Sequence, residues 1–167
     1  MGRPMSGKAA DVTRSDGFLP TLLDRLVEAT SNGGAPLSRR TYQDTVLRDL
    51  HWLLNAIAPL SQTVSESYPH LRDCVLNFGI PGTSGGILTK RELDALAVEI
   101  EHAILAFEPR VLPDSLSVSV ISDRDAAIRN QLVFRIAAAF WFDPYPLELS
   151  ICAQWDIESG LVGLREE

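Results

Sequence analysis

The chain has 167 residues, of which 46% are hydrophobic and 22% charged, and this size and balance are typical of one globular domain. The formal net charge of −7 and the isoelectric point of about 4.9 argue against a nucleic-acid binder, which usually presents a basic face. Two cysteines are too few for a disulfide framework, and the lack of a signal-peptide-like stretch or of about 20 consecutive apolar residues argues against secretion and direct membrane insertion, so we expect a cytoplasmic protein.

The N-terminal part predicts a tail followed by two helices. Residues 1–16 contain few large apolar side chains, and we expect a flexible tail ahead of a single domain that spans residues 17–167. Apolar residues recur at helical spacing over 19–27. A stronger one-sided pattern over 46–57 predicts a second helix, with Thr41-Tyr42-Gln43-Asp44 as a capping-box-like start.

The middle of the chain predicts one more long helix. A short helix is expected from Pro69 to about Val75, and the segment 77–86 has too many glycines and prolines for a regular element. Thr89-Lys90-Arg91-Glu92 matches a capping box, and the helix behind it carries one apolar face as far as Phe107. Proline at position 109 ends this helix, because its ring disfavours helical backbone at the preceding residue.

In the C-terminal part, the spacing of apolar residues changes from the 3.6-residue period of a helix to the two-residue period of a strand. Alternating apolar residues predict four strands, at about 116–120, 132–140, 147–157 and 161–165. Helices followed by a run of strands indicate an α+β fold, in which N-terminal helices precede a small mixed, mainly antiparallel four-stranded sheet. Its open edge would be either protected or used by a partner strand. Trp141 and Trp155 would be good interface anchors if exposed, but we expect both in the core.

The sequence contains no complete motif of catalytic or metal-ligating residues. Gly82-Thr83-Ser84-Gly85-Gly86 matches G-x-S-x-G, but no strand precedes it, and a flexible loop is the better interpretation. His51, His70 and His102 lack zinc-ligand spacing. We therefore expect no metal, no cofactor and no catalytic residue.

Paired carboxylates are the remaining catalytic alternative, because two of them suffice for glycoside hydrolysis. Glu108 at the helix end is the candidate acid, with Asp114, Asp123 or Asp156 as its partner. An ion pair or a hydrogen-bond anchor is the plainer role for Glu108, and Arg110, just past the proline, can present its planar fork in a fixed direction.

The corner Phe107-Glu108-Pro109-Arg110 is the most specific local feature, because an apolar helix ends there and the chain turns directly into a strand. One interpretation is a buried pair that only holds the turn. The other is an exposed corner that docks a partner. Residue chemistry alone slightly favours the first.

Three segments in this order resemble the TssE family of type VI secretion baseplate subunits: Val46-Leu47-Arg48-Asp49-Leu50-His51-Trp52-Leu53-Leu54-Asn55, Cys74-Val75-Leu76-Asn77-Phe78-Gly79-Ile80-Pro81, and Phe107-Glu108-Pro109-Arg110. That family is similar to the small wedge proteins of phage-tail baseplates, which are historically labelled lysozyme-like. The resemblance implies a domain similar to the connecting domain of contractile sheath subunits.

The resemblance also implies a function. A TssE-like chain would be a non-enzymatic subunit of a cytoplasmic baseplate docked at the inner membrane. It would dock on wedge subunits of the TssF, TssG and TssK type and would template the first ring of the contractile sheath. Glu108, Pro109 and Arg110 would take part in docking. The alternatives are a muramidase-like peptidoglycan hydrolase with Glu108 as acid, and a generic cytosolic adaptor.

Overall fold

The structure is a computed structural model that describes residues 21–27, 37–60, 64, 67–82, 89–121 and 131–167. The predicted tail at 1–16 and most of the glycine-rich segment 82–86 lie outside the described residues.

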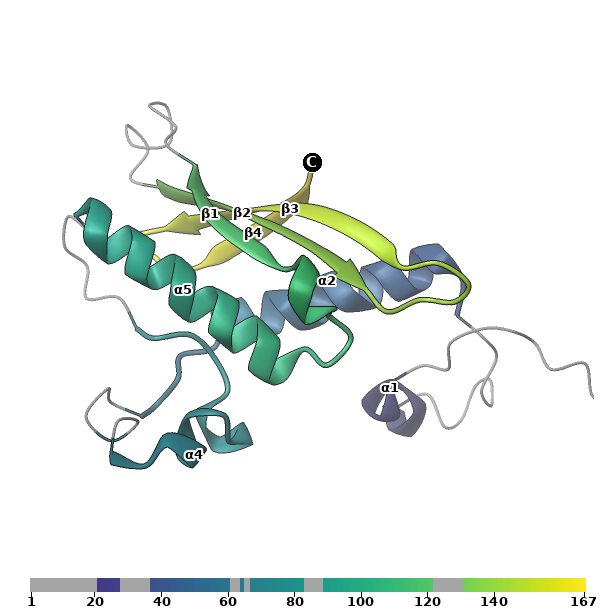
Figure 1. Ribbon diagram of the computed structural model, residues 1–167, viewed down its shortest axis with the longest axis horizontal. Helices are drawn as coiled ribbons and strands as arrows, with labels where there is room; N and C mark the ends of the chain where they lie inside the picture. The colour runs from purple at the N-terminus through teal and green to yellow at the C-terminus, as the bar shows by residue number, and fades with distance from the viewer. Residues whose placement is uncertain (1–20, 28–36, 61–63, 65–66, 83–88, 122–130) are drawn as a thin grey trace, which may run out of the picture.

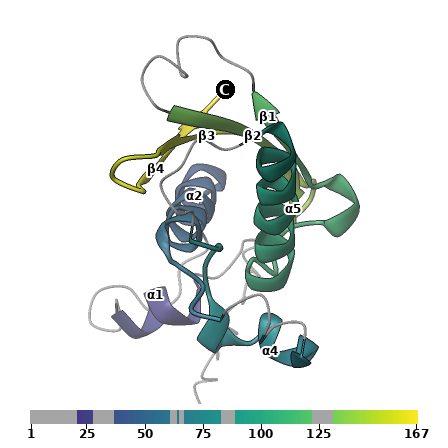
Figure 2. The ribbon, with the colours of Figure 1, turned by 90° about the vertical axis from the view of Figure 1, so that its left-hand side faces the viewer.

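The described chain forms three layers (Figures 1 and 2). A four-stranded sheet lies above the long helices α2 and α5, and the short helices α1 and α4 lie on the far side of those helices from the sheet. The helices are α1 (Leu22–Val27), α2 (Arg39–Asn55), α4 (Pro69–Arg72) and α5 (Lys90–Phe107), with 3-10 turns η1 (Val75–Asn77) and η2 (Pro113–Ser115).

The sheet has the order β1-β2-β3-β4, and all three pairings are antiparallel. The two central strands, β2 (Gln131–Phe140) and β3 (Leu147–Asp156), have ten residues each, whereas the edge strands β1 (Ser117–Ile121) and β4 (Val162–Glu166) have five each. The predicted α+β class, with helices first and a sheet afterwards, is confirmed.

The core lies between the sheet and the two long helices. Alternate residues of the central strands, such as Phe134 and Ile151, point toward α2 and α5, as the period of two predicts. Trp155 belongs to this core, as expected. The prediction for Trp141 is wrong, because its side chain is 60% exposed. Phe140 is the last buried residue of β2, and the next residue along a strand points to the opposite side.

The start of α2 differs from the prediction. Ser38, not Thr41, is the N-cap, and its hydroxyl oxygen accepts the backbone N–H of Thr41 at 3.1 Å. The capping box of α5 is confirmed, because the Thr89 hydroxyl accepts the backbone N–H of Glu92 at 3.4 Å and the Glu92 carboxylate accepts that of Thr89 at 2.7 Å.

The end of α2 is tied to the segment that follows η1. The helix ends at Asn55, so Ile57 lies beyond it and is exposed rather than on the apolar helical face. The backbone of Ile80 bonds to Ala56 and Ala58 at 3.0 and 2.9 Å. Gly79 allows this approach, because it has a φ of +128° and a Cβ there would lie 2.4 Å from the Ala56 carbonyl oxygen.

Candidate partner-docking site

The helix–sheet corner is anchored at both ends by backbone hydrogen bonds. The N–H of Glu108 donates to the carbonyl of Ile104 at 2.8 Å, which closes the last turn of α5. Two residues later, the carbonyl of Arg110 accepts the N–H of Trp141 at 2.7 Å. The corner therefore joins the end of α5 to the end of β2.

Glu108 and Arg110 form a bidentate ion pair across Pro109. The Glu108 carboxylate is 4% exposed, and both of its oxygens accept Arg110 side-chain donors, Nε and Nη2, at 2.6 Å. One oxygen also accepts the backbone N–H of Arg110 at 3.1 Å. Such forked, charge-assisted pairs are strong and directional, so this pair locks the turn.

Arg110 has a second carboxylate partner on α2. Its Nη2 donates to Asp49 Oδ2 at 2.6 Å, and its guanidinium carbon lies 5.8 Å from the centre of the Tyr42 ring. Burial lowers the pKa of Arg110, but hydrogen bonds and charge from Glu108 and Asp49 outweigh it and hold the pKa above its usual value. The guanidinium therefore stays charged, and it ties α2 to the corner.

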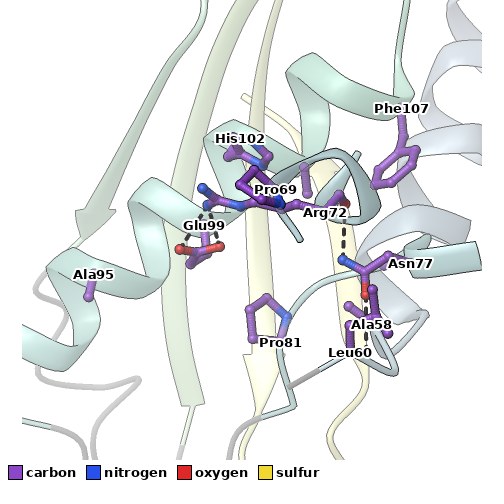
Figure 3. Close-up of a pocket in the computed structure, with 12 residues that line it drawn as sticks. Ala58, Leu60, Pro69, Arg72, Asn77, Pro81, Ala95, Glu99, His102 and Phe107 are labelled. Carbon is purple, nitrogen blue, oxygen red and sulfur yellow. Dashed lines mark hydrogen bonds and ion pairs between the residues drawn. The ribbon is translucent and has the colours of Figure 1, made fainter. Parts of the chain in front are cut away.

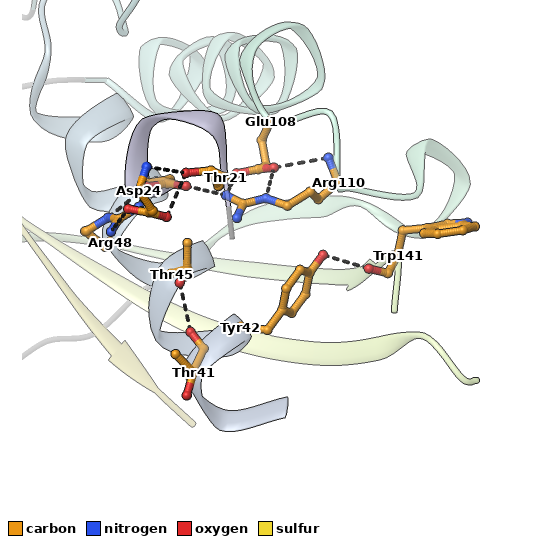
Figure 4. Close-up of polar contacts among 10 residues, drawn as sticks. Thr21, Asp24, Thr41, Tyr42, Thr45, Arg48, Glu108, Arg110 and Trp141 are labelled. Atoms are coloured by element: carbon orange, nitrogen blue, oxygen red, sulfur yellow. Dashed lines mark hydrogen bonds and ion pairs between the residues drawn. The ribbon is translucent and has the colours of Figure 1, made fainter. Parts of the chain in front are cut away.

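Arg48 extends these ion pairs to Asp24 of α1, and both residues are labelled in Figure 4. Arg48 donates to Asp49 at 2.8 and 3.0 Å and to Asp24 at 2.7 and 3.2 Å. The hydrogen bonds from Arg48 lower the pKa of Asp24, so this carboxylate stays ionised near neutral pH. The Arg48 guanidinium also lies over the ring of Trp52, 4.7 Å from its centre. One network thus connects α1, α2 and the corner.

A groove of about 420 Å³ opens beside this network. Its walls are more apolar than polar, and the aromatic residues Trp52, Phe78 and Phe107 contribute to them. Trp52 is 47% and Phe78 38% exposed, and the rings of Phe78 and Phe107 meet edge to face at 5.4 Å between centres. The other lining residues are Thr21, Arg48, Asp49, Leu50, Leu53, Glu108, Pro109 and Arg110.

All three segments that carry the family resemblance meet at this groove. The first supplies Asp49 and Trp52, the second supplies Phe78, and the third supplies the whole corner. The role of Asp49 and Arg48 was missed from the sequence. Charged residues on a helix are ordinarily solvated, so the sequence offered no chemical reason to select these two. Their position inside the first of the three resembling segments was the only signal.

The predicted site residues are not equally accessible. Glu108 is buried and the Arg110 side chain is 18% exposed, whereas Pro109 is exposed. The geometry therefore supports the buried-pair interpretation for Glu108 and Arg110. Direct contact of Glu108, Pro109 and Arg110 with a partner stays a prediction, and the exposed aromatic wall is the larger contact surface at this place.

A second cavity, of about 550 Å³, separates α4 from α5 (Figure 3). Its polar residues bind one another: Arg72 pairs with Glu99 at 2.9 Å, and the Asn77 amide donates to the Arg72 carbonyl at 3.0 Å. His102 lies 3.2 Å from Asp73 at the same junction. These contacts attach the α4 layer to α5. We assign no catalytic role to the residues that make them.

Within the described residues no group of three or more His, Cys, Asp or Glu side chains is arranged to hold a metal ion. The three histidines are apart: His51 is on α2, His70 on α4 and His102 on α5. Every helix within the described residues is too short or too polar to cross a membrane.

Of the proposed carboxylate pairs, the one between Glu108 and Asp156 does not assemble. Both Glu108 oxygens are bound by Arg110. Asp156 pairs with Gln131, at the far end of β2 from Trp141 and the corner, and a ten-residue strand spans roughly 30 Å. Glycosidase carboxylates lie at most about 9.5 Å apart. Asp114 is exposed on η2, and Asp123 lies outside the described residues.

Residues 40–145 match the sequence family described as baseplate wedge protein gp25. The chain belongs to this family. Its members are structural proteins of phage-tail-like baseplates, so the family supports a structural role. The matched residues include all of α2 except Arg39, the corner and β2, and therefore the Asp49–Arg110–Glu108 contacts.

Among solved structures, a crystal structure of a candidate tail lysozyme from Geobacter sulfurreducens is similar to this gp25-family chain. It has 14% sequence identity and a TM-score of 0.37, and the alignment covers 79% of this chain and 91% of the other. Comparison with curated proteins found no match.

Proposed function

We propose that this chain is a TssE-type structural subunit of a type VI secretion baseplate, on the cytoplasmic side of the inner membrane. It docks on wedge subunits of the TssF, TssG and TssK type and templates the first ring of the contractile sheath. Membership of the baseplate wedge family supports the structural role. The observation that carries the proposal is the convergence of the three TssE-like segments on one groove.

The groove is the proposed wedge-docking surface. Its exposed rings, Trp52 and Phe78, have the size and partial exposure of interface anchors. The buried ion pairs behind them hold Phe107 and Pro109 in place and therefore act as positioning residues rather than contacts. Docking thus depends on Glu108 and Arg110 through the shape of the corner.

Pull-down of wedge subunits tests this assignment. The variant Trp52→Glu removes an aromatic anchor from the groove wall and should reduce wedge capture at least about tenfold, because losing such an anchor costs about 2 kcal/mol or more and 1.4 kcal/mol is already tenfold. The control Tyr145→Glu makes the same kind of change at a residue that is 72% exposed in the turn between β2 and β3. Equal capture by both variants and the unchanged chain would remove the docking role of the groove.

A muramidase function gains no support from the geometry. An acid catalyst has to reach the leaving oxygen of its substrate. Glu108 is 4% exposed and both of its oxygens are occupied by Arg110.

A further inference from the structure

The long helix α5 has sides of different composition. Its buried side packs in the core and contains Leu96, Ala97, Ile100, Ala103 and Ile104. A second side faces α4, because Glu99 pairs with Arg72 at 2.9 Å and His102 lies 3.2 Å from Asp73. Residues return to the same side of a helix every three or four positions, so these contacts fix how the whole helix is turned.

A third side of α5 is open. Figure 2 shows the sheet above α5, α2 beside it and α4 below it, and no described α-helix lies against the remaining side. The helical period places there a stripe of four residues, Asp94, Val98, Glu101 and Leu105, which we call the outer stripe. Val98 is 62% and Leu105 41% exposed, so two large apolar side chains of this stripe face solvent.

The outer stripe has the spacing of a coiled-coil seam. Its residues are four, three and four positions apart, so Val98 and Leu105 are one heptad apart, and so are Asp94 and Glu101. Residues at this spacing stay in line with a second helix that packs alongside, because two helices that wind around each other have 3.5 residues per turn. The spacing therefore fits a helical occupant.

The two carboxylates of the outer stripe determine the charge of that occupant. Neither Asp94 nor Glu101 has an ion-pair partner among the described residues, although Lys90 and Arg91 lie four and three positions before Asp94. Like charges that meet across an interface oppose binding, and opposite charges fix its register. The facing helix therefore needs lysine or arginine opposite Asp94 and Glu101. The formal net charge of −7 also favours a basic partner.

We propose that the outer stripe of α5 binds an amphipathic helix of a partner protein, on which apolar and basic residues recur at heptad spacing. Its apolar side chains pack on Val98 and Leu105, and its basic side chains pair with Asp94 and Glu101. Charged pairs in a helical seam select the register and cost stability, so the contact is specific and weak. The outer stripe shares no residue with the proposed wedge-docking groove, and the inference does not depend on the function proposed above.

An anionic membrane surface fits the outer stripe less well. Lipid-binding helices present clusters of about four to eight lysine and arginine residues to negative headgroups. The outer stripe presents Asp94 and Glu101 instead, and these carboxylates would be repelled by such a surface. A basic helix of a protein is therefore the occupant that the charges favour.

Methyl NMR of the full chain tests the site, because it detects weak binding and locates it. The probe is a helical peptide of three heptads whose seam contains leucine and lysine, and its control has glutamate in place of lysine. We expect the methyl signals of Val98 and Leu105 to shift with the lysine peptide, at an affinity at least about tenfold above that of the glutamate peptide at low salt. Shifts at Val118 and Val120 of β1 instead, or equal affinity for the two peptides, would overturn the proposal.

Charge-reversed chains supply the matched control, with binding measured by the anisotropy of the labelled peptide. Asp94→Lys with Glu101→Lys should weaken the lysine peptide at least about tenfold. Asp44→Lys with Glu148→Lys makes the same change in net charge at exposed positions of α2 and β3 and should leave the affinity unchanged. Equal weakening in the two double variants would show attraction to the net charge alone, which contradicts a site on α5.

Removing the apolar side chains separates packing from charge. Val98→Ala with Leu105→Ala keeps both carboxylates and a good helix former at each position, so α5 is expected to stay folded. The lysine peptide should bind several-fold more weakly to this variant, because apolar residues at heptad spacing stabilise a helical seam. An unchanged affinity would show that no helix packs on the outer stripe and would overturn the proposal.

The same measurements identify two other occupants. Sedimentation of the chain alone would show a second copy as the occupant if the chain self-associates and Asp94→Lys with Glu101→Lys abolishes this. Phosphatidylserine vesicles that shift the Val98 and Leu105 signals when the lysine peptide does not would show a membrane surface as the occupant. Either result would overturn the proposal.

Discussion

Arg110 shows why the function of a charged residue depends on its surroundings. It binds two carboxylates, Glu108 beside it in the chain and Asp49 on another helix, and it lies against Tyr42. A buried guanidinium with two acidic neighbours is stable only while both stay in place. The same residue type on an exposed corner would be a free contact for a partner, which is the alternative that the sequence left open.

Breaking this pair on one side should be more harmful than removing both partners. Arg110→Met leaves Glu108 buried without a partner, and we expect a loss of about 3–5 kcal/mol in the free energy of unfolding. Glu108→Gln combined with Arg110→Met removes both charges and should lose less. Urea unfolding measures the difference, with Arg25→Met on the exposed face of α1 as the control.

If the single and double variants lose the same free energy of unfolding, Glu108 and Arg110 do not stabilise each other. Their proposed positioning role is then wrong. The double variant is also the better one for wedge pull-downs, because it is expected to keep more of the fold.

At the scale of elements, the two long helices differ in how well their starts were predicted. The α5 start was predicted correctly because a capping box is a reciprocal contact between residues three apart. The α2 start was placed three residues too late. Ser38 and Thr41 are both good caps, and the polar pair Arg39-Arg40 hides the first turn from the apolar pattern.

A pair of substitutions separates the two candidate starts of α2. Ser38→Ala should destabilise the protein by about 0.5–2 kcal/mol, because the backbone N–H of Thr41 loses its acceptor. Asp44→Ala, which would remove the capping-box acid of the sequence-based prediction, should change stability by less than about 0.5 kcal/mol. Thermal unfolding compares them, and a larger effect at Asp44 would restore the start at Thr41.

At the scale of the whole molecule, the layered arrangement separates two surfaces. The groove with Trp52 and Phe78 lies at the junction of α1, α2 and the corner, whereas β1 is an edge strand of the sheet. The proposed wedge-docking groove and the sheet edge at β1 are therefore different parts of the chain.

The absence of enzymatic activity is a prediction at the same scale. We expect no clearing of a peptidoglycan suspension by the purified chain, at concentrations where a known lysozyme clears it. Glu108→Gln should behave like the unchanged chain, because both Glu108 oxygens are bound to Arg110 and the neighbouring carboxylate, Asp49, is bound to the same guanidinium. Clearing that disappears in Glu108→Gln would reinstate the hydrolase.

The sequence by itself determined the order and type of the main elements, the α5 capping box, the corner at 107–110 and the family resemblance. These features depend on residues a few positions apart, so local patterns are enough to predict them.

Only the tertiary structure decided which residues work together. The Asp49–Arg110 contact joins residues 61 positions apart, and carboxylates are too common for the sequence to select this one. The structure also placed Trp155 inside and Trp141 outside, and it showed the Asn55 side chain bound to Val162 at the β4 edge of the sheet. The physical reason is that burial and ion pairing are set by which elements pack together, and that choice is made by the whole chain.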